Sequence, residues 1–171
     1  MWWGERGFVR ALVLLAVLGL AGCQLRPLYA SAPGAPGPQA DLPSISVQPP
    51  QDRIEQVYRN ALIFGLRGGG ESAPPRYELT YRMSTRSQGI AVERGTGTPN
   101  AYQITGGVSF LLKDIAADQS LFGASVTAID TYVRSSQNYS NIRAQRDAED
   151  RLAKALAELT QARLASYFAT N

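Results

Sequence analysis

The stretch RYELTYRM, residues Arg76–Met83, alternates strictly between two kinds of side chain. Tyr77, Leu79, Tyr81 and Met83 are large and mostly apolar, whereas the residues between them are charged or carry a hydroxyl group. Successive side chains of a strand point to opposite faces of a sheet, so this alternation predicts a β-strand. One face of the strand is expected to contact a core and the other to face a polar environment.

Two segments downstream have the same period. The sequence YQITGGVSFLLKDIA, which starts at Tyr102, places four apolar residues on one face, namely Ile104, Val108, Phe110 and Leu112. Residues 125–135, SVTAIDTYVRS, are rich in β-branched side chains and alternate as well. We therefore expect three long strands. The polar residues 84–89 leave two readings open, a twisted continuation of the first strand or a loop.

Residues 52–67 have the helical period of apolar residues. Asp52 is suited to cap the amino terminus, and Gly68–Gly70 is suited to end the helix. The GLRGGG stretch lacks the Lys and Ser or Thr of a phosphate-binding loop, so a helix stop is the better interpretation. The expected apolar stripe comprises Ile54, Val57, Tyr58, Ala61, Leu62 and Phe64.

A second helix is predicted from about Ile142 to Phe168, with a length of roughly 40 Å. Its amino terminus has three candidate caps, which are Asn138, Ser140 and Asn141. Its apolar stripe is expected to comprise Ala148, Leu152, Ala155, Leu156, Leu159, Ala162 and Tyr167. This amphipathic pattern favours packing on a sheet.

The order of these elements defines the expected fold. A short strand in SISVQP, around Ile45 and Val47, precedes the first helix, which gives the order β-α-β-β-β-α. Short turns between the long strands favour antiparallel pairing. The predicted fold class is α/β (α+β), a two-layer sandwich with an antiparallel-rich sheet of about four strands and two helices on one face. The other face would be polar and rich in threonine, with Arg76, Glu78, Thr80, Arg82, Thr105, Ser109, Thr127 and Thr131.

The first residues have the layout of an export signal. Arg6 and Arg10 precede an apolar run, residues 11–22, which ends in small residues directly before Cys23. Twelve residues of helix span about 18 Å, which is too short for a hydrocarbon core of about 30 Å. The prediction divides the chain into a signal peptide (1–22), a Pro- and Gly-rich tether (23–43) and a folded domain (44–171).

The sequence LAGC at residues 20–23 resembles the lipobox of bacterial lipoproteins, and Cys23 is the sole cysteine of the chain. The resemblance implies an S-diacylglycerol and N-acyl modification of Cys23, which would anchor the protein because two or more acyl chains bind a membrane firmly. Gln24 stands where an aspartate would favour retention in the inner membrane, so the resemblance implies the outer membrane. A chance cysteine after an ordinary signal peptide is the alternative.

The residues after the cysteine suggest a family. Arg26, Pro27, Leu28 and Tyr29 resemble the RPLY start of mature members of the LptE family, which are lipopolysaccharide-assembly lipoproteins. The resemblance implies a two-layer α/β domain in the outer membrane, with the LptD β-barrel and lipopolysaccharide as partners. It implies neither catalysis nor a cofactor. The polar sheet face would then be solvated or would contact the polar interior of the barrel.

Composition narrows the alternatives. The chain has no histidine, which excludes histidine-based acid–base catalysis and ordinary zinc sites, and we expect no metal. A net charge of +3 without a basic run argues against nucleic-acid binding. One rival function is an auxiliary lipoprotein of an ABC-type lipid transporter. The other is a lipid-anchored hydrolase that uses Asp114 or Asp130, although turn chemistry explains Asp114 and Asp118 better.

Arginine supplies nearly all the positive charge, with fifteen arginines against two lysines. Biased base composition of the gene is the simplest explanation, but guanidinium groups also bind phosphates well. The lipid A phosphates could be bound by Arg82, Arg86 and Arg134, which we expect to converge if the strands pair as predicted. Arg94 and Arg143 are further candidates, and ordinary surface charge is the alternative for all of them.

Overall fold

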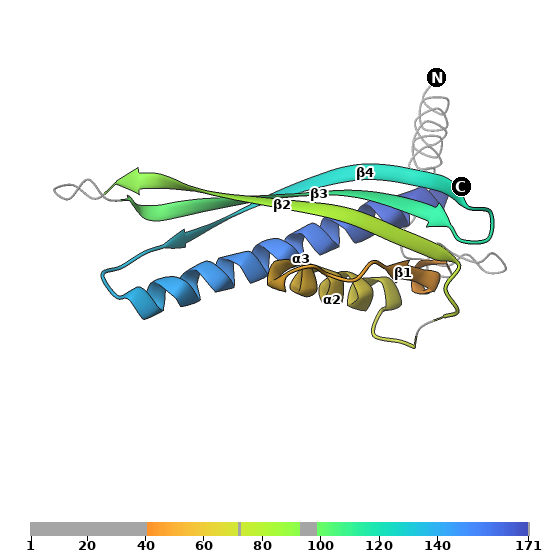
Figure 1. The fold of residues 1–171 in the computed structure, drawn as a ribbon, viewed down its shortest axis with the longest axis horizontal. Coiled ribbons are helices and arrows are strands. Elements are labelled where there is room, and N and C mark those ends of the chain that lie inside the picture. The colour runs from red at the N-terminus through yellow and green to blue at the C-terminus, as the bar shows by residue number, and fades with distance from the viewer. Residues whose placement is uncertain (1–40, 72, 93–98, 171) are drawn as a thin grey trace, which may run out of the picture. The chain divides into compact units, whose positions relative to one another are not determined.

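A computed structural model describes residues 41–71, 73–92 and 99–170 (Figure 1). The predicted signal peptide, most of the predicted tether, Cys23 and the RPLY residues lie outside the described residues, as does Arg94. The described part begins with a short 3-10 helix, η1 (Leu42–Ser44), in which Leu42 is buried. Leu42 therefore belongs to the folded core, although the sequence pattern places it in the tether.

The sheet has four strands in the order β1-β2-β3-β4. The short strand β1 (Ile45–Val47) pairs in parallel with the start of β2 (Tyr77–Val92). Strand β2 pairs antiparallel with β3 (Pro99–Asp114), which in turn pairs antiparallel with β4 (Gln119–Val133). Residues 84–89 continue β2, so the first of the two readings of this segment is correct.

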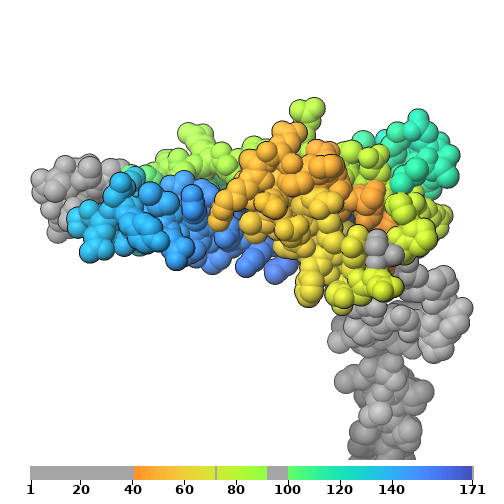
Figure 2. All heavy atoms as spheres, turned by 60° about the horizontal axis from the view of Figure 1, so that its bottom comes forward, coloured from red at the N-terminus to blue at the C-terminus, as the bar shows by residue number. Residues whose placement is uncertain are grey.

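Two helices, α2 (Arg53–Arg67) and α3 (Asn138–Thr170), cover the same face of the sheet (Figure 1). The predicted two-layer α+β sandwich is confirmed, with the predicted order of elements. Helix α2 lies beside α3 but is shorter, so the amino-terminal part of α3 extends past α2 (Figure 2). None of the described helices is both long and apolar enough to cross a bilayer.

The core lies between the inner face of the sheet and the two helices. Strand β3 supplies Ile104, Val108, Phe110 and Leu112 to it, as its alternation predicts. Gly106 lies in the same row and faces α3. A Cβ atom at Gly106 would lie 2.9 Å from methyl groups of both Leu152 and Leu156, so glycine is what lets the helix approach the strand.

Helix α2 begins and ends where the sequence predicts. The Asp52 carboxylate accepts a hydrogen bond of 2.9 Å from the backbone N–H of Glu55, and Gly68 ends the helix with φ of 58°. The predicted stripe is wrong at one end, because Phe64 is 71% exposed whereas Leu66 is buried. Phe64 lies on a flank of the helix that neither α3 nor the sheet covers.

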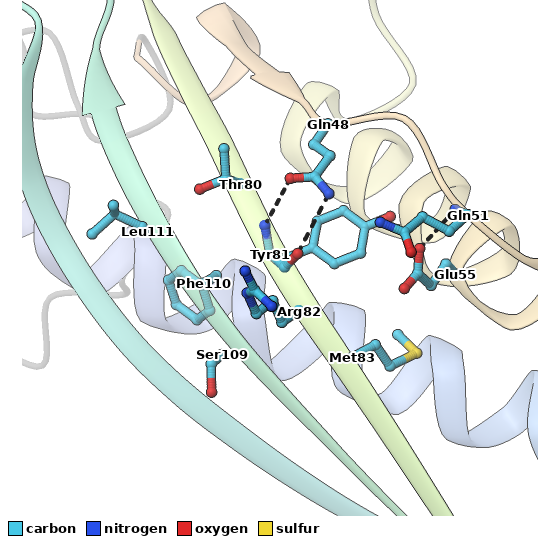
Figure 3. A pocket seen from close by; sticks show the side chains of 10 residues that line it. All are labelled: Gln48, Gln51, Glu55, Thr80, Tyr81, Arg82, Met83, Ser109, Phe110 and Leu111. Carbon is cyan, nitrogen blue, oxygen red and sulfur yellow. Dashed lines mark hydrogen bonds between the residues drawn. The ribbon is translucent and has the colours of Figure 1, made fainter.

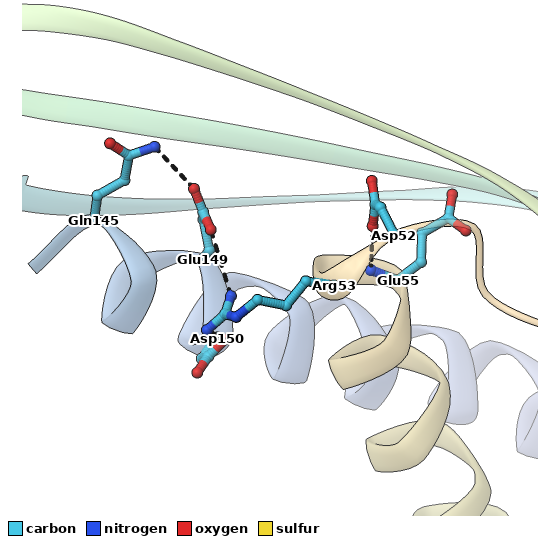
Figure 4. Close-up of polar contacts among 6 residues, drawn as sticks. All are labelled: Asp52, Arg53, Glu55, Gln145, Glu149 and Asp150. Atoms are coloured by element: carbon cyan, nitrogen blue, oxygen red, sulfur yellow. Dashed lines mark hydrogen bonds and ion pairs between the residues drawn. The ribbon is translucent and has the colours of Figure 1, made fainter. Parts of the chain in front are cut away.

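An ion pair fixes the start of α2 against α3. The guanidinium group of Arg53 lies 2.8 Å from the carboxylate of Asp150 and 3.5 Å from that of Glu149 (Figure 4). Gln145 donates a further hydrogen bond of 3.0 Å to Glu149. All these groups are at least partly exposed, so we expect the cluster to set the position of α2 more than to stabilise the fold.

Helix α3 starts at Asn138, earlier than predicted, and the three candidate caps lie inside it. Asn141 has a different role: its side chain is buried and bonds both the N–H and the C=O of Ser135, at 2.7 and 2.8 Å. It thereby fixes the turn between β4 and α3. The predicted stripe is wrong at Leu159, which is 42% exposed, and at Ala162, which is exposed too, because the helix packs through small residues such as Ala153 and Ala157.

Candidate interaction surface

The outer face of the sheet carries polar side chains from all three long strands. Paired residues of antiparallel strands share a face, so Arg82 lies beside Ser109, and Ser109 beside Ser125. The next row along the sheet joins Arg86, Thr105 and Ile129 in the same way. The eight polar residues predicted for this face all lie on it or at its end.

Apolar residues interrupt this polar face. Leu111, Ile129 and Val133 are 42%, 61% and 69% exposed. They are spread over two strands, and Leu111 and Ile129 lie in rows that also hold polar residues, whereas Val133 lies in a row with Ala101 and Ala91. Such a surface suits contact with a polar wall or with water better than burial in lipid.

A hollow lies at the edge of the sheet, where β1 ends. Its volume is about 710 Å³ and it opens widely to solvent (Figure 3). Its lining comes from the end of β1, from the start of α2 and from β2 and β3, and comprises Gln48, Gln51, Glu55, Thr80, Tyr81, Arg82, Met83, Ser109, Phe110 and Leu111. The lining is mostly polar, as expected of a binding surface for a polar chain or group.

The hollow exists because β1 is so short. Pro49 and Pro50 follow Gln48, and proline cannot supply the N–H groups that would extend the strand. The side-chain amide of Gln48 takes the place of the next strand residue. Its Oε1 accepts from the N–H of Tyr81 at 3.3 Å, and its Nε2 donates to the C=O of Tyr81 at 3.5 Å (Figure 3).

Tyr81 points its ring from β2 toward Gln51 and Glu55 at the start of α2 (Figure 3). Burial, with a smaller contribution from the carboxylate of Glu55, raises the pKa of Tyr81 to about 12, whereas Arg59 opposes the shift. The Tyr81 hydroxyl is buried and has no hydrogen-bond partner among the described residues. A buried hydroxyl without a partner is uncommon, and this one belongs to a residue that lines the hollow.

The predicted arginines do not converge. Arg82 and Arg86 project from the outer face of β2, four residues or about 13 Å apart. Arg134 follows β4 at the far end of the sheet, and its guanidinium group lies 5.3 Å from the ring centre of Tyr102 on the inner face. Arg143 lies over Tyr139 at the start of α3. Phosphate binding by these residues stays a prediction, which the geometry now limits to Arg82 and Arg86 as a pair.

The three aspartates considered for catalysis have structural partners. Asp114 accepts hydrogen bonds from the N–H groups of Ala116 and Ala117 at 2.9 and 3.0 Å, as in a turn. Asp118 pairs with Lys113, whose pKa this hydrogen bond raises. Asp130 pairs with Arg151 at 2.8 Å.

Asp114 and Asp130 are also too far apart to act together. Asp130 pairs with Ile104, which lies ten residues or about 33 Å along β3 from Asp114. A carboxylate pair of a glycosidase needs roughly 5–10 Å. No group of three potential metal ligands occurs within the described ranges. Among the described residues, these aspartates therefore do not form the kind of carboxylate pair considered for catalysis.

Comparison with known proteins gives one family and several related folds. The profile of the family described as "LptE: Lipopolysaccharide-assembly" matches residues 42–164, which span the described fold up to the last turns of α3. No sequence among the curated proteins matches the chain.

Two crystal structures share the fold. A protein of Caulobacter crescentus CB15 assigned as a lipoprotein superimposes with a TM-score of 0.64 at 25% identity, over 78% of this chain and 97% of that chain. A minor lipoprotein of Acinetobacter baumannii gives a TM-score of 0.52 at 16% identity, over 71% of this chain and 88% of that chain. At such low identity, the second likeness concerns the fold alone.

Proposed function

Because the chain belongs to the LptE family of lipopolysaccharide-assembly proteins, we propose that it is an outer-membrane lipoprotein that assembles with the LptD β-barrel. Together with the barrel it would insert lipopolysaccharide into the outer leaflet of the outer membrane. The family match over residues 42–164 carries this proposal. The lipobox at residues 20–23 supports the lipoprotein part, with Cys23 as the lipidated residue.

The polar face of the sheet supports the barrel as partner. The interior of an outer-membrane barrel is polar, and hydroxyl-rich strands can lie against it because polar groups of the wall can bond their side chains. Arg82, Ser109 and Thr127 project from this face. The contribution of the protein would be to occupy and shape the lumen, with no step of covalent chemistry.

Depletion of the protein in its host tests this function. We expect surface-exposed lipopolysaccharide and the correctly folded form of the largest outer-membrane barrel to fall together, while other lipoproteins stay at their normal level. Tagged protein purified from outer membranes should bring down that barrel. Lipopolysaccharide export that is unchanged by depletion would contradict the proposal. Co-purification of an inner-membrane ABC transporter would favour the transporter-lipoprotein alternative.

A further inference from the structure

Strand β2 has an open edge beyond the end of β1. Strand β1 pairs only with Tyr77–Leu79, whereas β2 continues to Val92. Leu79 accepts a hydrogen bond of 3.0 Å from the backbone of Gln48, and Tyr81 is bonded by the Gln48 side chain. No strand of the described part of the chain pairs with this edge after Tyr81.

The register shows which backbone groups this edge presents. Backbone groups alternate in direction along a strand, and those of Leu79 and Tyr81 point toward β1. The N–H and C=O groups of Met83, Thr85, Ser87 and Gly89 should therefore point to the open edge, and those of the residues between them toward β3. An edge of this length is a ready template for another strand.

The opposite edge of the sheet is partly capped. Helix α3 packs against β4 and β3. In addition, the guanidinium group of Arg151 donates a hydrogen bond of 3.2 Å to the C=O of Thr131 on β4. Among the described residues, β2 has no such cap beyond Gln48. Both edges of the described sheet are therefore unpaired over part of their length, and the β2 edge beyond Gln48 is the one that lies beside the hollow.

We propose that the β2 edge from Met83 to Gly89 binds an extended segment of the barrel partner as an added strand, with acidic side chains opposite Arg82 and Arg86. This inference rests on the function proposed above, because it takes the barrel as the source of the segment. Main-chain hydrogen bonds would provide affinity, as in other cases of strand addition, and the arginines would select the partner.

Charge complementarity determines the chemistry of the segment. Arg82 and Arg86 form no ion pair with any described residue. They lie on the same face four residues apart, so a strand beside β2 would meet them with carboxylates that are also four residues apart. On the other side of the edge Glu55 lines the hollow, so the residue that enters there should not be acidic.

Two other occupants fit less well. A second copy that paired antiparallel through the same edge would bring the arginines of two β2 strands together, and like charges in cross-strand positions are destabilising. Residues 24–40 of this chain contain no acidic residue and four prolines, which lack the N–H groups that pairing needs. An acidic segment of another polypeptide is therefore the best complement.

Hydrogen exchange on the full-length protein, alone and in complex with the co-purified barrel, tests the proposal. In the protein alone, we expect the amide hydrogens of Met83, Thr85, Ser87 and Gly89 to exchange rapidly. In the complex these amides should become protected. The amides that face the open edge and those that face β3 should then both exchange slowly.

A proline variant tests the backbone contact directly. Thr85→Pro removes an N–H that faces the edge, and proline is tolerated at edge positions of this kind. We expect it to weaken barrel binding about tenfold, whereas Thr85→Ala, which keeps the N–H, should bind as the wild type does. Arg82→Gln and Arg86→Gln should weaken binding too, and Arg163→Gln on α3 serves as their control.

The other possible results distinguish failure of this inference from failure of the proposed function. If the barrel binds but the edge amides exchange as fast as in the free protein, the inference is wrong and the proposed function stands. If no barrel binds, the proposed function fails and the inference with it. If the edge amides of the free protein become more protected from exchange as its concentration rises, the edge binds a second copy instead. Loss of lipopolysaccharide binding without loss of the barrel in the arginine variants would assign these residues to lipid phosphates.

Discussion

The hydroxyl group of Tyr58 on α2 donates a hydrogen bond of 3.1 Å to Oγ1 of Thr160 on α3, and neither side chain is exposed. The hydroxyl of Thr160 donates in turn to the C=O of Leu156 at 2.9 Å. This short chain of hydrogen bonds joins the two helices inside an otherwise apolar layer. It satisfies two buried hydroxyl groups that neither helix could satisfy with apolar neighbours alone.

The two partners of this bond should differ in their effect on stability. Thr160→Val leaves the Tyr58 hydroxyl buried without a partner, so we expect the free energy of unfolding to fall by about 1–3 kcal/mol. Tyr58→Phe leaves Thr160 bonded to Leu156 and should cost less, about 0.5–1.5 kcal/mol. Urea unfolding measures both, with Thr160→Ser as the control that keeps the hydroxyl. Equal stability of Thr160→Val and the wild type would contradict the prediction.

Stability should decrease at alkaline pH. Burial raises the pKa of Tyr58 above its ordinary value and that of Tyr81 to about 12. Below the ordinary tyrosine pKa of about 10 both groups are protonated in the folded and unfolded states, so they add no pH dependence. Above it the unfolded state loses protons first, and stability is lost as the pH rises.

Each buried tyrosine should contribute a slope of about 1.4 kcal/mol per pH unit between its unfolded and folded pKa. Unfolding midpoints measured between about pH 9 and 12 would show this fall. The slope should be smaller in Tyr58→Phe, which removes one of the two groups. Parallel curves for the variant and the wild type would show that Tyr58 is not responsible.

Gly106 should tolerate no large side chain. A Cβ atom there would lie 2.9 Å from the methyl groups of Leu152 and Leu156, so Gly106→Val has to displace α3 from β3. Overpacking of this kind costs about 1–3 kcal/mol, which thermal or urea unfolding detects. Gly107→Val is the matched control, because its Cβ atom points to the other face and meets no atom closer than 3.5 Å. Equal losses in the two variants would contradict the explanation.

Cys23 should carry the membrane anchor. We expect Cys23→Ser to abolish incorporation of labelled palmitate and to release the protein from the membrane fraction, because no thioether can form. The mature wild-type protein should begin at Cys23, with acyl chains detectable by mass spectrometry. Gln24→Asp should keep the lipid but move the protein to the inner membrane. A Cys23→Ser protein that stays membrane-bound would refute the anchor.

Sequence periodicity predicted elements better than it predicted helix faces. The alternation in Arg76–Met83 gave the correct buried face, because a strand has only two faces and a shift of one residue would bury charge. A helix has a continuous range of directions. Phe64 and Leu159 are exposed because the helices pack through alanine and glycine, whose small side chains carry little signal in a hydrophobic pattern.

The candidate surface was only partly predictable for a similar reason. The alternation of residues predicted the polar outer face, and the high arginine content suggested arginines as phosphate-binding candidates. The hollow depends on the length over which β1 pairs with β2 and on the Gln48 side chain that ends this pairing. Arg134 was wrongly predicted to lie near Arg82 and Arg86. It follows the end of β4, where a shift of one residue moves a side chain to the opposite face of the sheet.

The order of strands and helices, the polar and apolar sides of β2 and the resemblance to lipoproteins were determined by the sequence itself. They depend on local period and on short motifs, and neighbouring residues are enough to define these. The pairing partners of β1, the burial of Tyr58 against Thr160 and the open edge after Tyr81 were decided by tertiary structure. Each of these joins residues that are distant in the chain, and only the packing of the helices on the sheet brings them together.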